Sequence, residues 1–117
     1  MSDAAIIARF ARGRARERLE RVEARRAALL SAVPALARLL VDRGARRVWL
    51  FGSLAWGRAD ERSDLDLAVE GLPAEALLEA LGALLTAAPC AVDLVRMEEA
   101  PGALASRIRA EGRRLHG

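Results

Sequence analysis

Lysine, asparagine, glutamine and tyrosine are missing from this chain of 117 residues, so all 19 of its basic side chains are arginines. Any cationic side chain that binds a phosphate here must therefore be an arginine. The single cysteine excludes an internal disulfide bond and agrees with a reducing compartment. No apolar run approaches the ~20 residues that span a bilayer, and the N-terminus lacks the pattern of a secretory signal. We therefore expect a cytoplasmic protein with no membrane partner.

The arginines are unevenly placed along the chain. The net charge is only +3, yet eight arginines lie between Arg9 and Arg26, opposed in that stretch by three glutamates. Hydrophobic residues make up 53% of the chain, which is typical of a folded globular protein of one domain. We therefore predict a basic helical arm over residues 1–25 and one folded domain over residues 26–117.

Three interpretations of the basic arm stay open. It is a solvated helix of mixed charge, a docking surface for a partner, or a track for RNA or another polyanion through arginine–phosphate contacts. Phe10 is the only aromatic ring among these arginines. This weakens the nucleic-acid interpretation, because binding of single strands commonly uses stacking on aromatic rings.

The spacing of apolar residues and helix breakers predicts an α/β fold. A helix with Asp3 as its cap should run from residue 4 toward residue 30, kink or restart at Pro34, and stop at Gly44. The remaining expected elements are strands at 48–51, 65–70 and 91–95, a short helix or loop at 54–62, a helix at 73–89, and a last helix that follows Gly102 and includes Leu115. We expect a small mixed sheet of about three strands flanked by helices, joined to the long N-terminal helical arm.

Two aspartates, Asp64 and Asp66, lie one residue apart at the start of the second expected strand. Residues i and i+2 of a strand point to the same face, so both carboxylates project together. Carboxylates this close repel each other unless a cation or a shared proton intervenes. Magnesium takes oxygen ligands and is commonly held by one or two carboxylates plus substrate phosphates. The alternative is a solvated strand edge with two aspartates that have no function.

A turn of Gly52 and Ser53 directly follows the first expected strand, and Gly57 comes shortly after it. Glycine lets the backbone approach an anion closely, and Ser53 adds a hydroxyl group. An ordinary strand-to-helix turn is one alternative. A P-loop is another, but Arg58 stands where a P-loop has lysine, and Ala59 where it has serine or threonine. We therefore expect the aspartates to be the magnesium ligands.

A third carboxylate, Asp93, lies within the apolar run 91–95. An unpaired carboxylate in a buried strand is costly, and a metal ion would justify it. The alternative is an aspartate at a frayed strand end. With the earlier pair, Asp93 completes a candidate metal site.

The spacing of these residues resembles the active-site pattern of the minimal nucleotidyltransferases, a family of the DNA polymerase beta superfamily. The residues that carry the resemblance are Gly52, Ser53, Gly57, Ser63, Asp64, Asp66 and Leu67. The segment 108–115 is also similar to the tail of that family, with much less specificity. The resemblance covers roughly residues 36–115 and leaves the basic arm outside.

The resemblance implies a polymerase beta-like nucleotidyltransferase fold and a catalytic site of three aspartates. Two Mg²⁺ ions would be held by Asp64, Asp66 and Asp93, and Asp93 would also orient or deprotonate the attacking hydroxyl. The substrate would be a nucleoside triphosphate, most often ATP, whose AMP is transferred while pyrophosphate leaves. The residues expected to bind it are Gly52, Ser53, Gly57, Ser63 and Arg58, the last of which is otherwise a solvated loop arginine.

The family also implies a partner, because the chain is too short to carry the acceptor-binding helical domain of larger relatives. The usual partner is a small helical HEPN protein, and such pairs behave as toxin and antitoxin, the antitoxin attaching AMP to its toxin. Two other functions stay open: a non-catalytic module that neutralises a helical partner by covering it, and nucleotidyl transfer to a small molecule. A second copy of the chain is also a possible source of the acceptor site.

Overall fold

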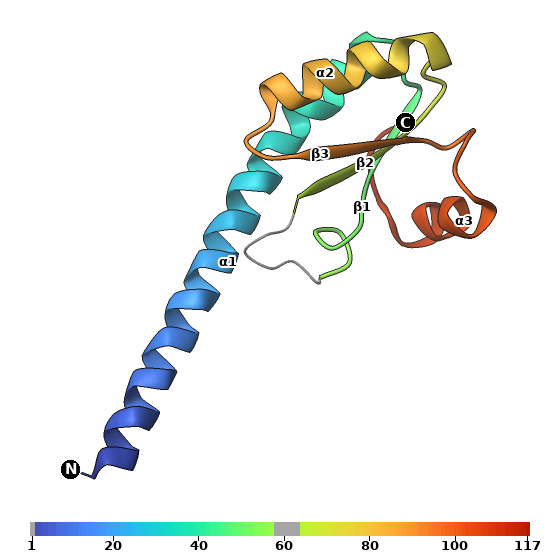
Figure 1. Cartoon of the computed structure of the whole chain (residues 1–117). Coiled ribbons are helices and arrows are strands. Elements are labelled where there is room, and N and C mark those ends of the chain that lie inside the picture. The colour runs from blue at the N-terminus through green and yellow to red at the C-terminus, as the bar shows by residue number, and fades with distance from the viewer. Residues whose placement is uncertain (1, 58–63) are drawn as a thin grey trace.

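The computed structural model of the chain describes residues 2–57 and 64–117 (Figure 1). Its elements are helix α1 (Asp3–Asp42), strands β1 (Arg47–Phe51) and β2 (Leu65–Glu70), 3-10 helix η1 (Ala74–Ala76), helix α2 (Leu77–Ala87), strand β3 (Val92–Arg96), helix α3 (Gly102–Glu111) and strand β4 (Arg113–His116). This order confirms the predicted α/β class. No helix within the described residues is long and apolar enough to cross a membrane.

The strands form one mixed sheet in the order β3-β2-β1-β4. Strand β1 is antiparallel to both β2 and β4, whereas β2 and β3 are parallel. The predicted mixed sheet is therefore confirmed, with four strands in place of about three. The parallel pair is connected by α2, which crosses over one face of the sheet as a parallel connection requires (Figure 1).

The prediction that the last helix reaches Leu115 was wrong, because the helix ends at Glu111 and the chain continues as β4. Gly112 explains the change. Its N–H donates to the carbonyl of Ile108 at 2.8 Å, and a Cβ at this position would lie 2.4 Å from that same oxygen. Only glycine fits so close to the preceding turn, and from it the backbone extends to pair with the free edge of β1.

Side chains of β1 alternate between two hydrophobic cores, one on each face of the sheet. Val48 and Leu50 belong to the larger core, which α1 and α2 cover. Trp49 and Phe51 belong to the smaller core, which includes Ile108 of α3. The sheet is therefore a middle layer between two helices on one face and one helix on the other (Figure 1).

Helix α1 is a single helix of 40 residues and does not restart at Pro34. The five buried residues of α1, Leu29, Val33, Leu36, Ala37 and Leu40, surround the proline, and we attribute the continuity of the helix to this packing. The helix begins one residue earlier than expected, because the Ser2 hydroxyl caps it by accepting from the N–H of Ala5 at 3.2 Å.

The first half of α1 extends away from the rest of the molecule (Figure 1). The whole molecule, with this half included, has extents of 65 × 30 × 20 Å. Residues 2–21 of this projecting half are all exposed. The predicted boundary between residues 25 and 26 lies within the continuous helix, a few residues before the first buried side chain. The division into a basic arm and a folded domain stays a prediction.

Candidate functional site

The sheet aligns two of the three candidate aspartates in one row. Asp66 of β2 lies opposite Phe51 of β1 on one side and opposite Asp93 of β3 on the other. Asp64 directly precedes β2 and lies two residues before Asp66, so strand alternation directs both to the same face. Because Phe51 belongs to the smaller core, this face is the one that α3 partly covers.

Gly52 brings the backbone after β1 directly against the side chain of Asp66. Gly52 has a φ of +77°, and a Cβ at this position would lie 2.1 Å from Oδ2 of Asp66. No other residue type fits here without displacing the carboxylate. The glycine-serine turn and the aspartates, which are separate in the sequence, are therefore parts of one site.

Burial raises the pKa of Asp66 above its ordinary value, and the neighbouring charges of Asp93 and Asp64 raise it further. Asp66 is half-buried, whereas Asp64 and Asp93 on either side of it are exposed. A cation between the carboxylates would relieve the repulsion between these three like charges.

The two outer aspartates, Asp64 and Asp93, are exposed, and for Asp93 this is contrary to expectation. Asp93 was predicted to be buried, but its side chain is exposed. The alternation of β3 explains this, because Val92 and Leu94 point into the larger core while Asp93 points to the opposite face. Burial therefore gives no reason for a metal at Asp93, and its alignment with Asp66 is the remaining argument.

Carboxylate oxygens are the ligands that Mg²⁺ prefers, and Gly52 lets the backbone after β1 come close to the Asp66 carboxylate. Within residues 2–57 and 64–117, no three acidic, histidine or cysteine side chains lie close enough together to form a metal cage. Mg²⁺ does not need such a cage, since it is usually held by one or two carboxylates, waters and phosphates. The donor set therefore fits the ion, and Asp66, which lies between the other two carboxylates, would be its central ligand.

The predicted phosphate-binding residues are only partly described. Ser53 is half-buried beside Gly52, and the exposed Gly57 has a φ of +74° with no described residue within 4 Å of the place of a Cβ. The positions of Arg58 and Ser63 lie outside the described residues. Their assignment to the nucleotide stays a prediction, as do those of Ser53 and Gly57.

Trp56 anchors the turn after Gly52 to helix α3. Its indole N–H donates to the carbonyl of Glu111 at 3.2 Å, and the guanidinium of Arg107 lies 3.6 Å from the ring centroid. Phe51 packs against the same ring with a centroid distance of 6.2 Å. Trp56 therefore stabilises the loop that carries Gly52, because both its N–H and a ring face are engaged within the chain.

Arg25 is a residue at the site that the sequence reasoning did not find. Its Nη2 lies 3.7 Å from Oδ1 of Asp64, although the two residues come from α1 and the start of β2. The sequence contained one hint, since Arg25 precedes Leu29 by one helical turn and Leu29 begins the buried stripe of α1. This spacing indicates which face of α1 carries Arg25, but it does not indicate which residue Arg25 contacts.

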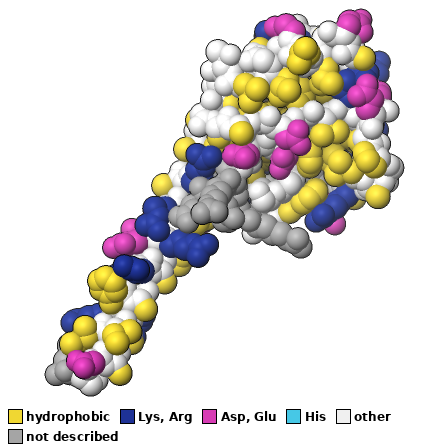
Figure 2. All heavy atoms as spheres, in the orientation of Figure 1, with side chains coloured by type: hydrophobic (Ala, Val, Ile, Leu, Met, Phe, Trp, Pro, Cys, Tyr) yellow, Lys and Arg dark blue, Asp and Glu magenta, His cyan; other side chains and the backbone are white. Residues whose placement is uncertain are grey.

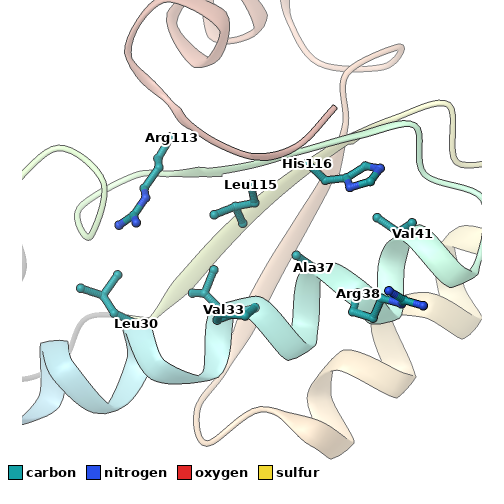
Figure 3. A pocket seen from close by; sticks show the side chains of 9 residues that line it. Leu30, Val33, Ala37, Arg38, Val41, Arg113, Leu115 and His116 are labelled. Atoms are coloured by element: carbon teal, nitrogen blue, oxygen red, sulfur yellow. The ribbon is translucent and has the colours of Figure 1, made fainter.

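A separate groove of about 300 Å³ lies between α1 and the edge strand β4 (Figure 3). Apolar side chains such as Val33 and Leu115 form its floor, and Arg38, Arg113 and His116 add polar groups. None of the candidate aspartates lines this groove. It is therefore distinct from the carboxylate cluster.

Residues 36–117 match the sequence pattern of the family described as Polymerase beta, Nucleotidyltransferase. The chain therefore belongs to this family and is a nucleotidyltransferase, which confirms the predicted polymerase beta-like fold and enzyme class. No match was found among curated protein sequences.

Solved structures are similar to this chain over about two thirds of its length or more. A chain of a toxin–antitoxin crystal structure with AMP-PNP is 31% identical, with a TM-score of 0.61 and coverage of 69% of each chain. A chain of the toxin–antitoxin MntA–HepT is 28% identical, with a TM-score of 0.56, covering 71% of this chain and 68% of that one. A third similar chain belongs to a complex of a tri-AMPylated HEPN toxin from Shewanella oneidensis with an MNT antitoxin. It is 26% identical, with a TM-score of 0.60 and coverage of 76% and 72%. The resemblance to minimal nucleotidyltransferases is thereby confirmed.

Proposed function

We propose that this chain is a Mg²⁺-dependent adenylyltransferase that moves AMP from ATP to a hydroxyl group of a HEPN-like partner protein. The observation that carries the proposal is the alignment of Asp93 with Asp66, whose carboxylate lies against Gly52, in a chain of the nucleotidyltransferase family. The similar structures support the nucleotide and the partner, since one contains AMP-PNP and another a tri-AMPylated HEPN toxin with an MNT antitoxin.

In this proposal each residue of the cluster has one task. Asp64 and Asp66 hold Mg²⁺, which when bound supplies positive charge to the attacking and leaving oxygens. The backbone of Gly52 and the hydroxyl of Ser53 bind the β- and γ-phosphates of ATP. Asp93, exposed beside Asp66, takes the proton of the acceptor hydroxyl.

The transfer is one displacement at phosphorus. The acceptor oxygen forms a bond to the α-phosphorus of ATP, and the bond from that phosphorus to the bridging oxygen of the β-phosphate breaks. Pyrophosphate leaves with the electron pair, and the acceptor carries AMP. The chain contributes mainly by positioning the reactants and neutralising charge.

A second candidate function is a binding module that neutralises a helical partner by covering it. The observation that favours it is the exposure of Ile6, Ile7, Phe10 and Leu19 on the projecting half of α1, where each side chain is at least 50% exposed. Such large apolar side chains on a helix are typical of a protein-docking surface.

Labelling with α-³²P-ATP and Mg²⁺ separates these functions. Wild-type protein, co-purified with its partner, is incubated with the label beside the Asp64→Asn/Asp66→Asn double variant. We expect a labelled partner band with the wild type and none with the variant. An unlabelled partner that still binds the wild type tightly would favour the binding module, and label found only on a small molecule would identify a different acceptor class.

A further inference from the structure

Arg25 occupies a fixed position at the junction between the projecting half of α1 and the packed half. It lies one turn before Leu29, which is 0% exposed in the larger core. Because helix geometry is rigid over one turn, the packing of Leu29 sets where the Cα of Arg25 lies relative to the sheet. Arginines and other charged side chains meet at this junction (Figure 2).

The guanidinium of Arg25 lies beside Asp64, the outer carboxylate that precedes β2. Its Nη2 lies 3.7 Å from Oδ1 of Asp64, with side-chain exposures of 33% and 52%. This distance is an ion pair and is too long for a hydrogen bond. The Cys90 thiol lies in the same neighbourhood. Burial is the largest influence on the pKa of this thiol and raises it. A hydrogen bond with the Leu65 backbone and the positive charge of Arg25 lower this pKa, and the negative charge of Asp64 raises it.

We propose that α1 contributes Arg25 to the nucleotide site as a substrate-binding residue whose guanidinium contacts the β- or γ-phosphate of ATP. The inference rests on the proposed function, in which Asp64 holds the cation that the triphosphate also binds. A group 3.7 Å from Asp64 is then beside the phosphates of the same ion.

An arginine beside a metal-binding carboxylate is chemically suited to bind a phosphate of the same ion. At 3.7 Å the ion pair of Arg25 with Asp64 is too long for a hydrogen bond, so it does not fix the guanidinium on that carboxylate. Arginine binds phosphate through two parallel N–H groups, and the chain has no lysine to do so. When Asp64 binds a metal ion, the guanidinium exchanges a carboxylate neighbour for a phosphate one.

The test compares binding of two nucleotides by isothermal titration calorimetry with Mg²⁺ present. AMP-PNP carries the β- and γ-phosphates, and AMP lacks them. The variants are Arg25→Ala, Arg25→Lys and the control Arg18→Ala, an exposed position two helical turns earlier on the same face. We expect Arg25→Ala to weaken AMP-PNP binding about 10- to 100-fold, as loss of a charged hydrogen bond does. Its AMP binding should change less than twofold, Arg25→Lys should restore part of the loss, and Arg18→Ala should match the wild type.

Two results would overturn this assignment. Arg25→Ala that binds AMP-PNP within twofold of the wild type removes Arg25 from the phosphate site. Arg25→Ala that loses AMP and AMP-PNP binding equally means that this substitution damages the site as a whole. If Arg25→Lys loses binding of both nucleotides in the same way, a role based on the charge of Arg25 is excluded. Wild-type protein that binds neither nucleotide would instead overturn the proposed function itself, before Arg25 is in question.

Discussion

Asp66 and Glu70 lie four residues apart on the same face of β2, near opposite ends of the strand. The charged neighbours of the two carboxylates differ. Glu70 accepts a hydrogen bond from Arg109 at 2.6 Å and another from Arg47, and these bonds lower its pKa. Burial raises the pKa of Asp66, and the charges of Asp93 and Asp64 add to the effect. At one end of β2 the carboxylate of Glu70 is paired with arginines, and at the other end Asp66 lies among other carboxylates.

The difference separates a structural end of the sheet from a functional end. At the Glu70 end, Arg47 belongs to β1 and Arg109 to α3, so one carboxylate joins three elements. At the Asp66 end, like charges lie side by side under a glycine turn, an arrangement that costs stability unless a cation enters. The comparison predicts opposite effects when each carboxylate is neutralised.

The largest effect is expected on AMP transfer. Asp66→Asn removes the charge of the central carboxylate, and we expect transfer to fall by at least ~100-fold, because charge neutralisation supplies much of the rate in such reactions. Glu70→Gln is the matched variant on the same strand face and should retain most of the activity. Initial rates with α-³²P-ATP measure both. Comparable losses in the two variants would remove the functional distinction between the ends.

Gly52→Ala should have the next largest effect. The added Cβ would lie 2.1 Å from Oδ2 of Asp66 in a backbone with φ of +77°, so the carboxylate or the turn must move. We expect AMP-PNP binding to fall more than tenfold and the protein to lose about 1–3 kcal/mol of stability. Gly44→Ala is the control, because its φ of +112° brings similar backbone strain, while among the described residues an added Cβ would have only the Cδ of Pro73 near it, at 3.6 Å. Equal loss of nucleotide binding in both variants would show that strain, and not contact with Asp66, is responsible.

Stability without divalent cations should respond in the opposite sense to activity. The pKa of Asp66 is raised in the folded state, so its favourable contribution is complete at low pH and is lost as the pH rises through that pKa. Asp66→Asn removes the ionised form, and we expect its Tm in EDTA to exceed that of the wild type by a few degrees at pH 7–8. The difference should shrink as the pH falls toward 4. A variant that is less stable than the wild type at pH 8 contradicts this explanation.

Local patterns in the sequence predicted the parts of the site that depend on one segment. Alternation in the expected second strand predicted that Asp64 and Asp66 share a face, and the glycine-serine turn was found from its place after an apolar run. The contact between Gly52 and Asp66 was not predictable in the same way, because it depends on the antiparallel register that sets Phe51 opposite Asp66. Residue types in the sequence indicate which residues form the site, and the register of the strands determines how far apart these residues lie.

Long-range packing explains the elements that the sequence did not predict. The four residues of β4 have only one apolar side chain, Leu115, and form a strand because β1 offers an open edge. Arg25 lies 39 residues before Asp64 in the chain, and no spacing rule connects a helix to a strand across that separation. Both depend on contacts between segments that lie far apart in the sequence, which local propensity does not encode.

The smallest effect is expected at the structural end, where Glu70→Gln removes the charge that two arginines share. The side chain of Glu70 is 15% exposed, and we expect the loss of its charged hydrogen bonds to lower the free energy of unfolding by about 1 kcal/mol at pH 7. The pKa of Glu70 is lowered by folding, so its contribution is present above the pKa of the unfolded chain and is lost as the pH falls through the folded value. Urea unfolding at pH 7 and in acid measures this, with the exposed Glu75→Gln as control. The deficit of the Glu70 variant should disappear in acid, and a deficit that persists there would mean that packing, and not charge, connects β1, β2 and α3 at this end.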